Sequence, residues 1–355
     1  EYNEKCIQRQ IHLNFNKKRK GLAFCAGLFY NVSYHNIYLP GICKKTKASD
    51  GERSFMSYEK FVELLEKRLR EALPEEWDIC IRTVIKNNGR ERKGIVIREP
   101  GLNISPTIYL EGYFERYQRG YTLEEIGCQI KELYQHVKVT HRWEGGFLTE
   151  YENVRSRIIY RVVNCRKNQD YLRGIPYVPF LDLAVIFFVM LDLDGEDKTA
   201  FMPVGEEHLR LWNVKKEDVY REACQNTPRL LPAEFAPMQT VIYEMAGEEG
   251  PEEWEQGEED VHILTNSSRN FGAAAILYPS CLKRIGEYLG KDFYIMPSSI
   301  HEVIILPVSM APSWEELDLI VREMNQTQLD REDVLSDRVY FYCREKEKLM
   351  LPEKE

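Results

Sequence analysis

Residues 180–191 read Phe-Leu-Asp-Leu-Ala-Val-Ile-Phe-Phe-Val-Met-Leu, and this run sets the expected fold of the larger part of the chain. It is well short of the roughly 20 apolar residues that a helix needs to cross a bilayer. It is also rich in residues that favour strands, so it predicts a buried central strand. Residues 194–197 form the expected turn, after which residues 199–204 pair back as a neighbouring strand.

Strands and amphipathic helices surround this run, which predicts an α+β protein with a mixed sheet flanked by helices, in two units. Residues 56–145 are the expected small N-terminal domain, with a hairpin turn at Asn87-Asn88-Gly89. Residues 146–350 are the expected larger domain that holds the mixed sheet. Three of the predicted helices cover residues 106–117, residues 216–225 ending before Thr227-Pro228, and residues 273–289.

Helix starts are predicted from capping residues. Ser57, Thr122 and Ser313 each precede a helical pattern and are good N-caps. Glu125 lies three residues after Thr122, which predicts a capping box.

Residues 1–55 have a different composition from the rest of the chain. They contain no Met and carry 10 Lys and Arg against 4 Asp and Glu, whereas the other 300 residues carry 38 against 53. One interpretation is a basic tail for nucleic acid or a membrane surface, based on Lys17-Lys18-Arg19-Lys20. The other, which we favour, is an extension translated from upstream of a start at Met56. Either way, residues 1–55 are left out of the fold prediction.

The remaining composition limits the classes of function. The acidic balance from Met56 onward argues against an extended contact with a nucleic-acid backbone. The nine Cys occur singly, as in buried residues of a reducing compartment, so we expect neither a disulfide framework nor a metal site. No phosphate-binding, dinucleotide-binding or nucleophile-elbow motif occurs, and no cofactor is expected. These features predict a cytoplasmic protein without a membrane segment.

A first polar cluster, residues 265–272, reads Thr-Asn-Ser-Ser-Arg-Asn-Phe-Gly between a predicted strand and a predicted helix. Backbone N–H groups at a helix start can hold an anion, and an arginine and a glycine would assist. The alternative is simple capping of the helix. The candidate anion-binding residues are Asn266, Ser268, Arg269, Asn270 and Gly272.

A second cluster, Pro297-Ser298-Ser299-Ile300-His301-Glu302, follows the next predicted strand. Ser299 and His301 lie two residues apart, so an extended chain would place them on one face. With a carboxylate they could support nucleophilic or acid–base chemistry. The alternative is a hairpin turn with hydroxyl-to-backbone bonds.

The two clusters belong to one predicted β-α-β unit. If its strands, residues 261–265 and 293–296, are parallel neighbours, both clusters leave the same edge of the sheet, where ligands of open α/β sheets bind. Asp182, inside the apolar run, is expected to bind backbone N–H groups or an arginine near the strand start. Alternatively it is an acid in the same crevice. Ser299, His301, Glu302 and Asp182 are therefore the candidate catalytic residues.

Several short stretches also carry a family resemblance. They are Phe180-Leu-Asp-Leu-Ala-Val, Ala223 with Asn226-Thr227, Leu264-Thr-Asn266, Gly272-Ala-Ala, Pro297-Ser-Ser-Ile-His-Glu302 and Leu335-Ser-Asp-Arg-Val-Tyr340. From about Met56 to Tyr342 the chain resembles an uncharacterised domain-of-unknown-function family of gut Clostridia-type bacteria. The resemblance implies a bacterial cytosolic protein and brings no activity or cofactor with it.

Two functions are therefore expected to compete. The first is a non-catalytic interaction or regulatory protein that binds a protein partner or a small anionic ligand. The second is a small hydrolase or transferase acting on an anionic substrate at the Arg269/His301 sheet edge. Binding of nucleic acid through residues 1–55 is the weakest alternative.

Overall fold

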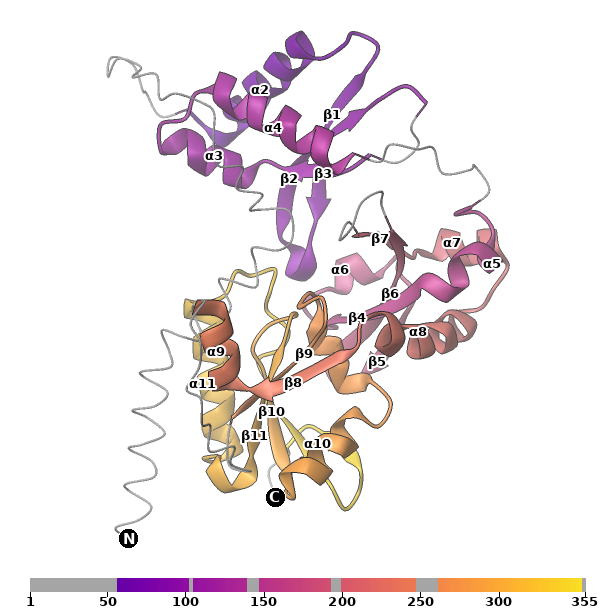
Figure 1. Ribbon diagram of the computed structural model, residues 1–355, viewed down its shortest axis with the longest axis vertical. Helices are drawn as coiled ribbons and strands as arrows, with labels where there is room; N and C mark the ends of the chain where they lie inside the picture. The colour runs from indigo at the N-terminus through magenta and orange to yellow at the C-terminus, as the bar shows by residue number, and fades with distance from the viewer. Residues whose placement is uncertain (1–55, 102–104, 139–146, 193–198, 247–260, 353–355) are drawn as a thin grey trace.

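The computed structural model describes residues 56–101, 105–138, 147–192, 199–246 and 261–352. It has an α+β fold with three sheets, which confirms the predicted fold class (Figure 1). Every pairing between described strands is antiparallel, whereas the sequence suggested a mixed sheet. The expected basic or upstream-translated segment, residues 1–55, lies outside the described residues.

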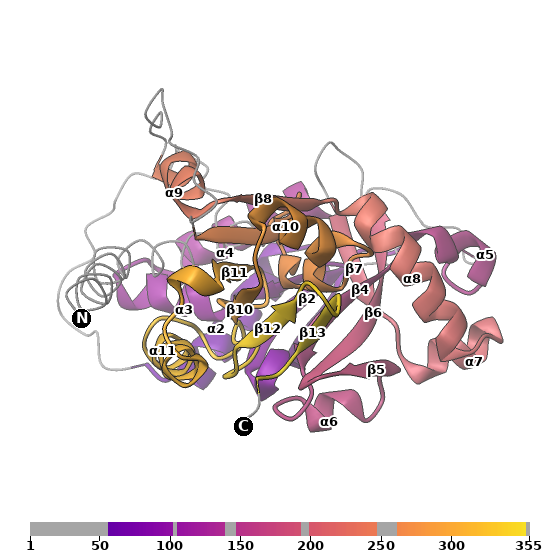
Figure 2. The same ribbon diagram turned by 90° about the horizontal axis from the view of Figure 1, so that it is seen from below.

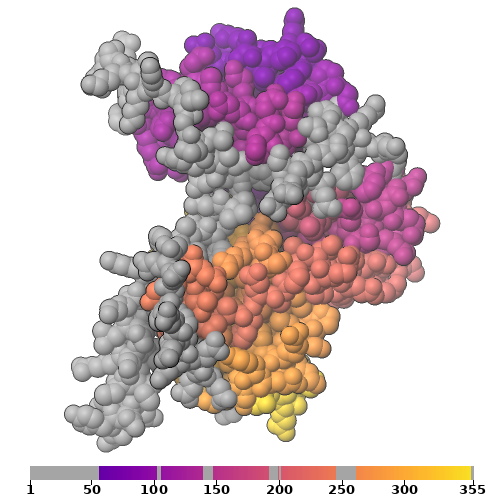
Figure 3. Space-filling model, in the orientation of Figure 1, coloured from indigo at the N-terminus to yellow at the C-terminus, as the bar shows by residue number. Residues whose placement is uncertain are grey.

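The N-terminal unit is a three-stranded sheet of order β1-β2-β3 with helices on one face. Its elements are α2 (Tyr58–Ala72), β1 (Asp78–Ile85), the 3-10 turn η1 (Asn87–Gly89), β2 (Glu91–Arg98), β3 (Thr107–Tyr109), α3 (Glu111–Gln118) and α4 (Leu123–Val137). Phe61, Leu65 and Ile95 lie in its core. In the space-filling view this unit and the C-terminal residues lie at opposite ends (Figure 3).

Strand β3 was missed by the sequence analysis, which predicted a helix over residues 106–117. The helix begins only at Glu111, because Thr107–Tyr109 pairs with β2. Gly94 lies opposite Tyr109, and a side chain at Gly94 would collide with the methyl group of Thr107. Because Gly94 has no side chain, β3 can pair closely with β2 at this position.

The rest of the chain forms a four-stranded sheet around β6 and a six-stranded sheet of order β13-β12-β10-β11-β9-β8. The first part comprises α5 (Tyr151–Val154), η2 (Arg155–Arg157), β4 (Ile158–Asn164), α6 (Gln169–Leu172), β5 (Tyr177–Phe180), β6 (Leu183–Asp192), β7 (Thr199–Pro203), α7 (Glu206–Trp212) and α8 (Lys216–Leu230). The second comprises β8 (Ala233–Pro237), α9 (Met238–Ala246), β9 (His262–Asn266), η3 (Gly272–Leu277), α10 (Cys281–Leu289), β10 (Phe293–Pro297), β11 (Val303–Pro307), η4 (Val308–Met310), α11 (Trp314–Thr327), β12 (Tyr340–Cys343) and β13 (Lys348–Met350).

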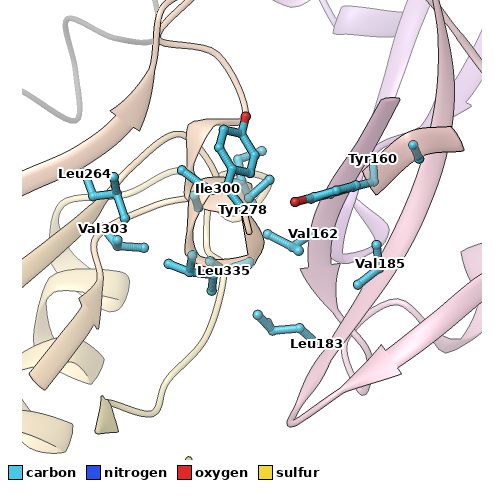
Figure 4. Packing of buried hydrophobic residues seen from close by; sticks show 14 of the residues in the cluster. Tyr160, Val162, Leu183, Val185, Leu264, Tyr278, Ile300, Val303 and Leu335 are labelled. Carbon is cyan, nitrogen blue, oxygen red and sulfur yellow. The ribbon is translucent and has the colours of Figure 1, made fainter. Parts of the chain in front are cut away.

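The largest core joins these two sheets. Tyr160 and Val162 of β4 pack toward Ile300 and Leu335 of the six-stranded part, and Tyr278 meets Tyr160 edge-on (Figure 4). Helices α7 and α8 contribute to this core, whereas α9 and α11 pack on the six-stranded sheet through a second core (Figure 2). The predicted buried strand is confirmed from Leu183 as β6, which pairs with β4, β5 and β7, but Phe180 ends β5 and the exposed Leu181 lies in the turn between the two strands.

Two predicted helix boundaries are wrong. Helix α8 does not end before Thr227-Pro228 but continues to Leu230. Its last turn is held by β4, because Thr227 Oγ1 accepts from the backbone N of Tyr160 at 3.0 Å and Asn226 donates to the carbonyl of Ile158 at 3.1 Å. The helix predicted over residues 273–289 is divided into η3 and α10 at Pro279, since proline removes a helical hydrogen bond.

The β1–β2 hairpin connects the two parts of the molecule at its tip. Asn168 Nδ2 donates to the side-chain oxygens of Asn87 and Asn88, at 2.9 and 3.0 Å. Its Oδ1 accepts from the backbone N of Asn88 at 2.7 Å. Asn88 Nδ2 in turn donates to the carbonyls of Arg331 and Val334, at 2.7 Å each. These buried amides fix the tip against the C-terminal part (Figure 1).

Replacing Asn168 by alanine tests this joint. Asn168→Ala leaves the buried N–H of Asn88 without its acceptor, so we expect the free energy of unfolding to fall by about 2–3 kcal/mol. Urea denaturation of the full chain measures it. Asn153→Ala is the matched control, because the exposed side chain of Asn153 bonds only Glu150, and its effect should stay within about 0.5 kcal/mol. Equal effects of the two substitutions would contradict the role of the joint.

Candidate functional site

The two polar clusters lie next to each other, although the strands that precede them are not adjacent in the sheet as predicted. Strands β9 and β10 are not neighbours, because β11 lies between them and is antiparallel to both. They consequently run in the same direction and end at the same edge of the sheet. There Thr265 Oγ1 donates to the carbonyl of His301 at 2.8 Å, and the backbone N of Phe271 donates to His301 Nδ1 at 3.2 Å.

Arg269 does not point to His301. Its guanidinium pairs with Glu234 at 3.4 Å and with Glu244 at 2.8 Å, on the outer side of β8. The bonds to these carboxylates raise its pKa. The predicted Arg269/His301 pair is therefore not assembled by the structure.

The rest of the first cluster is largely bonded within itself. Asn266 Oδ1 accepts from the backbone N of Ser268 at 3.1 Å and from its hydroxyl at 2.9 Å, and Asn266 Nδ2 donates to the carbonyl of Asn270 at 3.1 Å. Gly272 lies so close to Asn266 and His301 that a Cβ there would be 2.6 Å from the N of the first and the O of the second. The cluster thus shapes a tight loop, and an anion on it stays a prediction.

In the second cluster, Ser299 faces a carboxylate and not the imidazole. Ser299 Oγ donates to Glu302 Oε1 at 3.0 Å and accepts from the backbone N of His301 at 2.9 Å. Burial raises the pKa of Glu302. His301 Nε2 lies 3.4 Å from Asp333 Oδ1. These polar atoms bond one another in a buried turn. The arrangement is therefore closer to a structural turn than to a nucleophile with its base.

Asp182 is bound differently from the prediction. It directly precedes β6 and accepts from Ser336 Oγ at 2.6 Å, Tyr340 Oη at 2.7 Å and Asn164 Nδ2 at 3.3 Å. The expected backbone or arginine partners are replaced by two hydroxyl groups and an amide. Asp182 thereby ties the four-stranded sheet to the segment before β12.

The sequence analysis missed Arg161, in the middle of β4. Its side chain is 6% exposed and lies among three phenylalanine rings. The distances from Cζ to the ring centroids are 4.2 Å for Phe188, 4.0 Å for Phe201 and 3.7 Å for Phe271. No hydrogen bond or ion pair joins the guanidinium to another described residue, and Nη2 is fully buried without a partner. Burial lowers the pKa of Arg161 to about 9.

Lys86 is a second partly buried cation. It follows β1, and its ammonium lies 4.0 Å above the ring of Tyr109. Among the described residues none forms an ion pair with it. Burial, followed by the charges of Arg92 and Arg161, lowers the pKa of Lys86 to about 8. Lys86 and Arg161 therefore share one electrostatic environment across the joint between the two parts of the chain.

The neighbouring Arg92 has a different environment. It is also buried, but it pairs with Glu332 through a bond of 2.9 Å and with Glu111 at 3.7 Å. Arg92 is thus paired with carboxylates, whereas the guanidinium of Arg161 lies against three phenylalanine rings. We call Lys86, Tyr109, Arg161 and Phe271 the cation cluster hereafter.

A sequence signal for Arg161 did exist. Residues 158–163 read Ile-Ile-Tyr-Arg-Val-Val, so a charged residue interrupts an otherwise apolar strand. A fully buried arginine is unusual unless it is paired. Its lack of a carboxylate partner could not be read from the sequence, because it depends on the packing of β6, β7 and the loop after β9.

The chain belongs to a family of unknown function, DUF5688, whose model matches residues 58–344. No curated protein and no solved structure matches the chain. None of the helices in the described ranges is long and apolar enough to cross a membrane. Within those ranges, no group of three or more His, Cys, Asp or Glu side chains could hold a metal ion.

Proposed function

We propose that this protein is a ligand-binding regulatory protein that holds a small anion at the cation cluster. The observation that supports it most is the buried, unpaired guanidinium of Arg161 among three phenylalanine rings. The expected bacterial and cytosolic setting accompanies this proposal and stays a prediction. Any protein partner would distinguish the anion-bound protein from the anion-free protein.

The energetic cost of burying the charge of Arg161 favours the binding of an anion. Burying an ion costs several kcal/mol even after relaxation of the protein. Each cation–π contact returns about 0.5–2 kcal/mol, which offsets part of that cost. The charge of Lys86 adds repulsion to that of Arg161, and the carboxylate of Glu111 offsets part of the unfavourable environment of Lys86. A carboxylate or phosphate would neutralise both charges through strong charge-assisted hydrogen bonds.

The bonds of the candidate catalytic residues support binding over hydrolysis. Ser299, Glu302 and His301 bond one another or the backbone, and Asp182 is engaged by two hydroxyls. A nucleophile needs a base within hydrogen-bonding reach. The ring of Phe271 lies 5.3 Å from that of His301 and 3.7 Å from Cζ of Arg161, so the turn positions one member of the cation cluster.

Anion affinity is expected to depend on pH. Lys86 and Arg161 have pKa values of about 8 and 9 in the empty protein, and a bound anion raises both. Affinity should therefore be constant below about pH 7 and fall above pH 8, by up to about tenfold per pH unit for each proton lost. Isothermal titration with lactate, whose charge is constant from pH 6 to 10, measures this. A flat profile to pH 10 would contradict the assignment.

The proposal is tested by titrating acetate, lactate and inorganic phosphate into the full chain and into two arginine variants. Arg269→Met is the matched control, because Arg269 pairs with Glu234 and Glu244 and does not belong to the cation cluster. At least one anion should bind the natural chain and Arg269→Met equally, but not Arg161→Met. Binding that survives in Arg161→Met would overturn the proposal, as would no binding to the natural chain.

A further inference from the structure

The guanidinium of Arg161 is covered by the protein itself. Its side chain is 6% exposed, and three phenylalanine rings lie against Cζ. An anion can therefore reach the guanidinium only if one of these rings moves. Phe188 and Phe201 belong to the paired strands β6 and β7, whereas Phe271 lies in the loop between β9 and η3. Phe271 is consequently the ring that can move without disrupting a sheet.

The backbone of Phe271 is strained. Its φ is 55° and its ψ is 29°, in the left-handed region that bulky residues rarely adopt. The backbone on either side is held, because Thr265 Oγ1 donates to the carbonyl of His301 at 2.8 Å. The backbone N of Ala273 likewise donates to the carbonyl of Ile300 at 3.3 Å. The N–H of Phe271 itself donates to His301 Nδ1 at 3.2 Å, and this bond helps to hold the strained conformation.

The bond from Phe271 to His301 depends on the protonation of the imidazole. Because Nδ1 accepts a hydrogen bond it carries no proton, so the proton of the neutral ring lies on Nε2. Nε2 faces Asp333 Oδ1 at 3.4 Å. When the ring takes up a second proton both nitrogens become donors, and Nδ1–H would then point at the N–H of Phe271. The carboxylate of Asp333 stabilises the charged ring, whereas the bond to Phe271 is lost.

We propose that Phe271 is a gate over Arg161 and that the neutral form of His301 is the latch that keeps this gate closed. Charging of His301 releases the backbone of Phe271, and its ring then moves away from the guanidinium. The inference rests on the proposed function and describes the regulation of the same site.

The geometry also predicts which property of binding the gate controls. A guanidinium donates its hydrogen bonds in its own plane, and the ring of Phe271 lies 3.7 Å from Cζ of Arg161. A bound anion and the closed ring therefore occupy different sides of the guanidinium, so the gate closes again after an anion has entered. Charging of His301 should consequently raise the rates of anion entry and exit together and leave the affinity unchanged.

The charged groups around His301 act on the latch. Asp333 faces Nε2, and Glu302 is the next residue in the same turn. Burial raises the pKa of both carboxyl groups, and the positive charge of His301 opposes this rise. The groups that act at longer range are Asp330 and Arg92, through Asp333, and Arg161, beyond the ring of Phe271.

Hydrogen exchange at the Phe271 amide tests the latch in the full chain without a ligand. From pH 8 to pH 5 its protection factor, corrected for the intrinsic rate, should fall about tenfold as His301 becomes charged, because its N–H loses an acceptor. NMR of the histidine rings follows the charge in the same sample. In His301→Gln the protection should not change, because an amide oxygen still accepts the N–H but the side chain cannot be charged. His136→Gln, at an exposed position in the last turn of α4, is the control and should respond as the natural chain does.

Exchange spectroscopy with isotopically labelled lactate tests the gate. As His301 becomes charged, the rates of lactate association and dissociation should rise by the same factor, and the dissociation constant should not change. Protection of the Phe271 amide that is independent of pH, or that falls equally in His301→Gln, would refute the latch while lactate binding still stands. Lactate rates that do not follow the release of the Phe271 amide would refute the gate. If lactate binds at no pH, the proposed function is refuted and the gate with it.

Discussion

Arg161→Met is expected to abolish anion binding and, at the same time, to raise the free energy of unfolding by about 1–3 kcal/mol. Methionine fills a similar space among Phe188, Phe201 and Phe271 without a charge to desolvate. The loss of the cation–π contacts opposes this gain but is the smaller term. Denaturant unfolding in the absence of ligand, with titration calorimetry alongside, measures the two effects.

Arg92→Met is the control for Arg161→Met. Arg92 is similarly buried but paired, so its loss removes the cation that binds the buried carboxylate of Glu332. Removing one partner of a buried ion pair costs about 3–5 kcal/mol. The two arginine substitutions should therefore change stability in opposite directions. A comparable loss of stability in both would show that Arg161 is a structural residue and not a ligand residue.

Gly272→Ala should be among the most damaging single substitutions in the chain. Its Cβ would lie 2.6 Å from both the backbone N of Asn266 and the carbonyl O of His301, and closer still to Thr265. Two backbone segments would have to separate, which costs about 3 kcal/mol or more. Because Phe271 would move with them, anion affinity should fall as well.

Chemical denaturation and titration of the same sample measure both effects of Gly272→Ala. Gly174→Ala serves as the control, because nothing lies within 4 Å of its added Cβ and its backbone is not in the left-handed region. Its effect should stay within about 0.5 kcal/mol. A soluble Gly272→Ala protein of natural stability would contradict the close packing of the two clusters.

Much of the fold was predictable because local patterns and tertiary structure agree. The apolar run that became β6 is buried on both sides and pairs with three strands, as its composition indicated. The N-caps Ser57, Thr122 and Ser313 each accept a backbone N–H, and Glu125 completes the capping box. These signals lie within a few residues of the structure they specify.

The predictions that differ from the structure concern elements held by contacts between segments far apart in the sequence. Strand β3 depends on the bare backbone of Gly94, and the last turn of α8 on bonds to β4. The prediction that both clusters leave the same edge of the sheet agrees with the structure, but Arg269 does not point to His301. Arg269 meets Glu234 and Glu244 of another strand and helix, while Arg161 comes from a different sheet. Such pairings are set by topology and not by spacing along the chain.

The most direct test of the account is a crystal structure of the full chain soaked in bromide, with anomalous scattering used to locate the anion. The account predicts a strong peak between the guanidinium of Arg161 and the ammonium of Lys86, and its loss in Arg161→Met. Peaks confined to exposed side chains, with the space beside Arg161 empty or filled by a carboxylate of the protein itself, would contradict it.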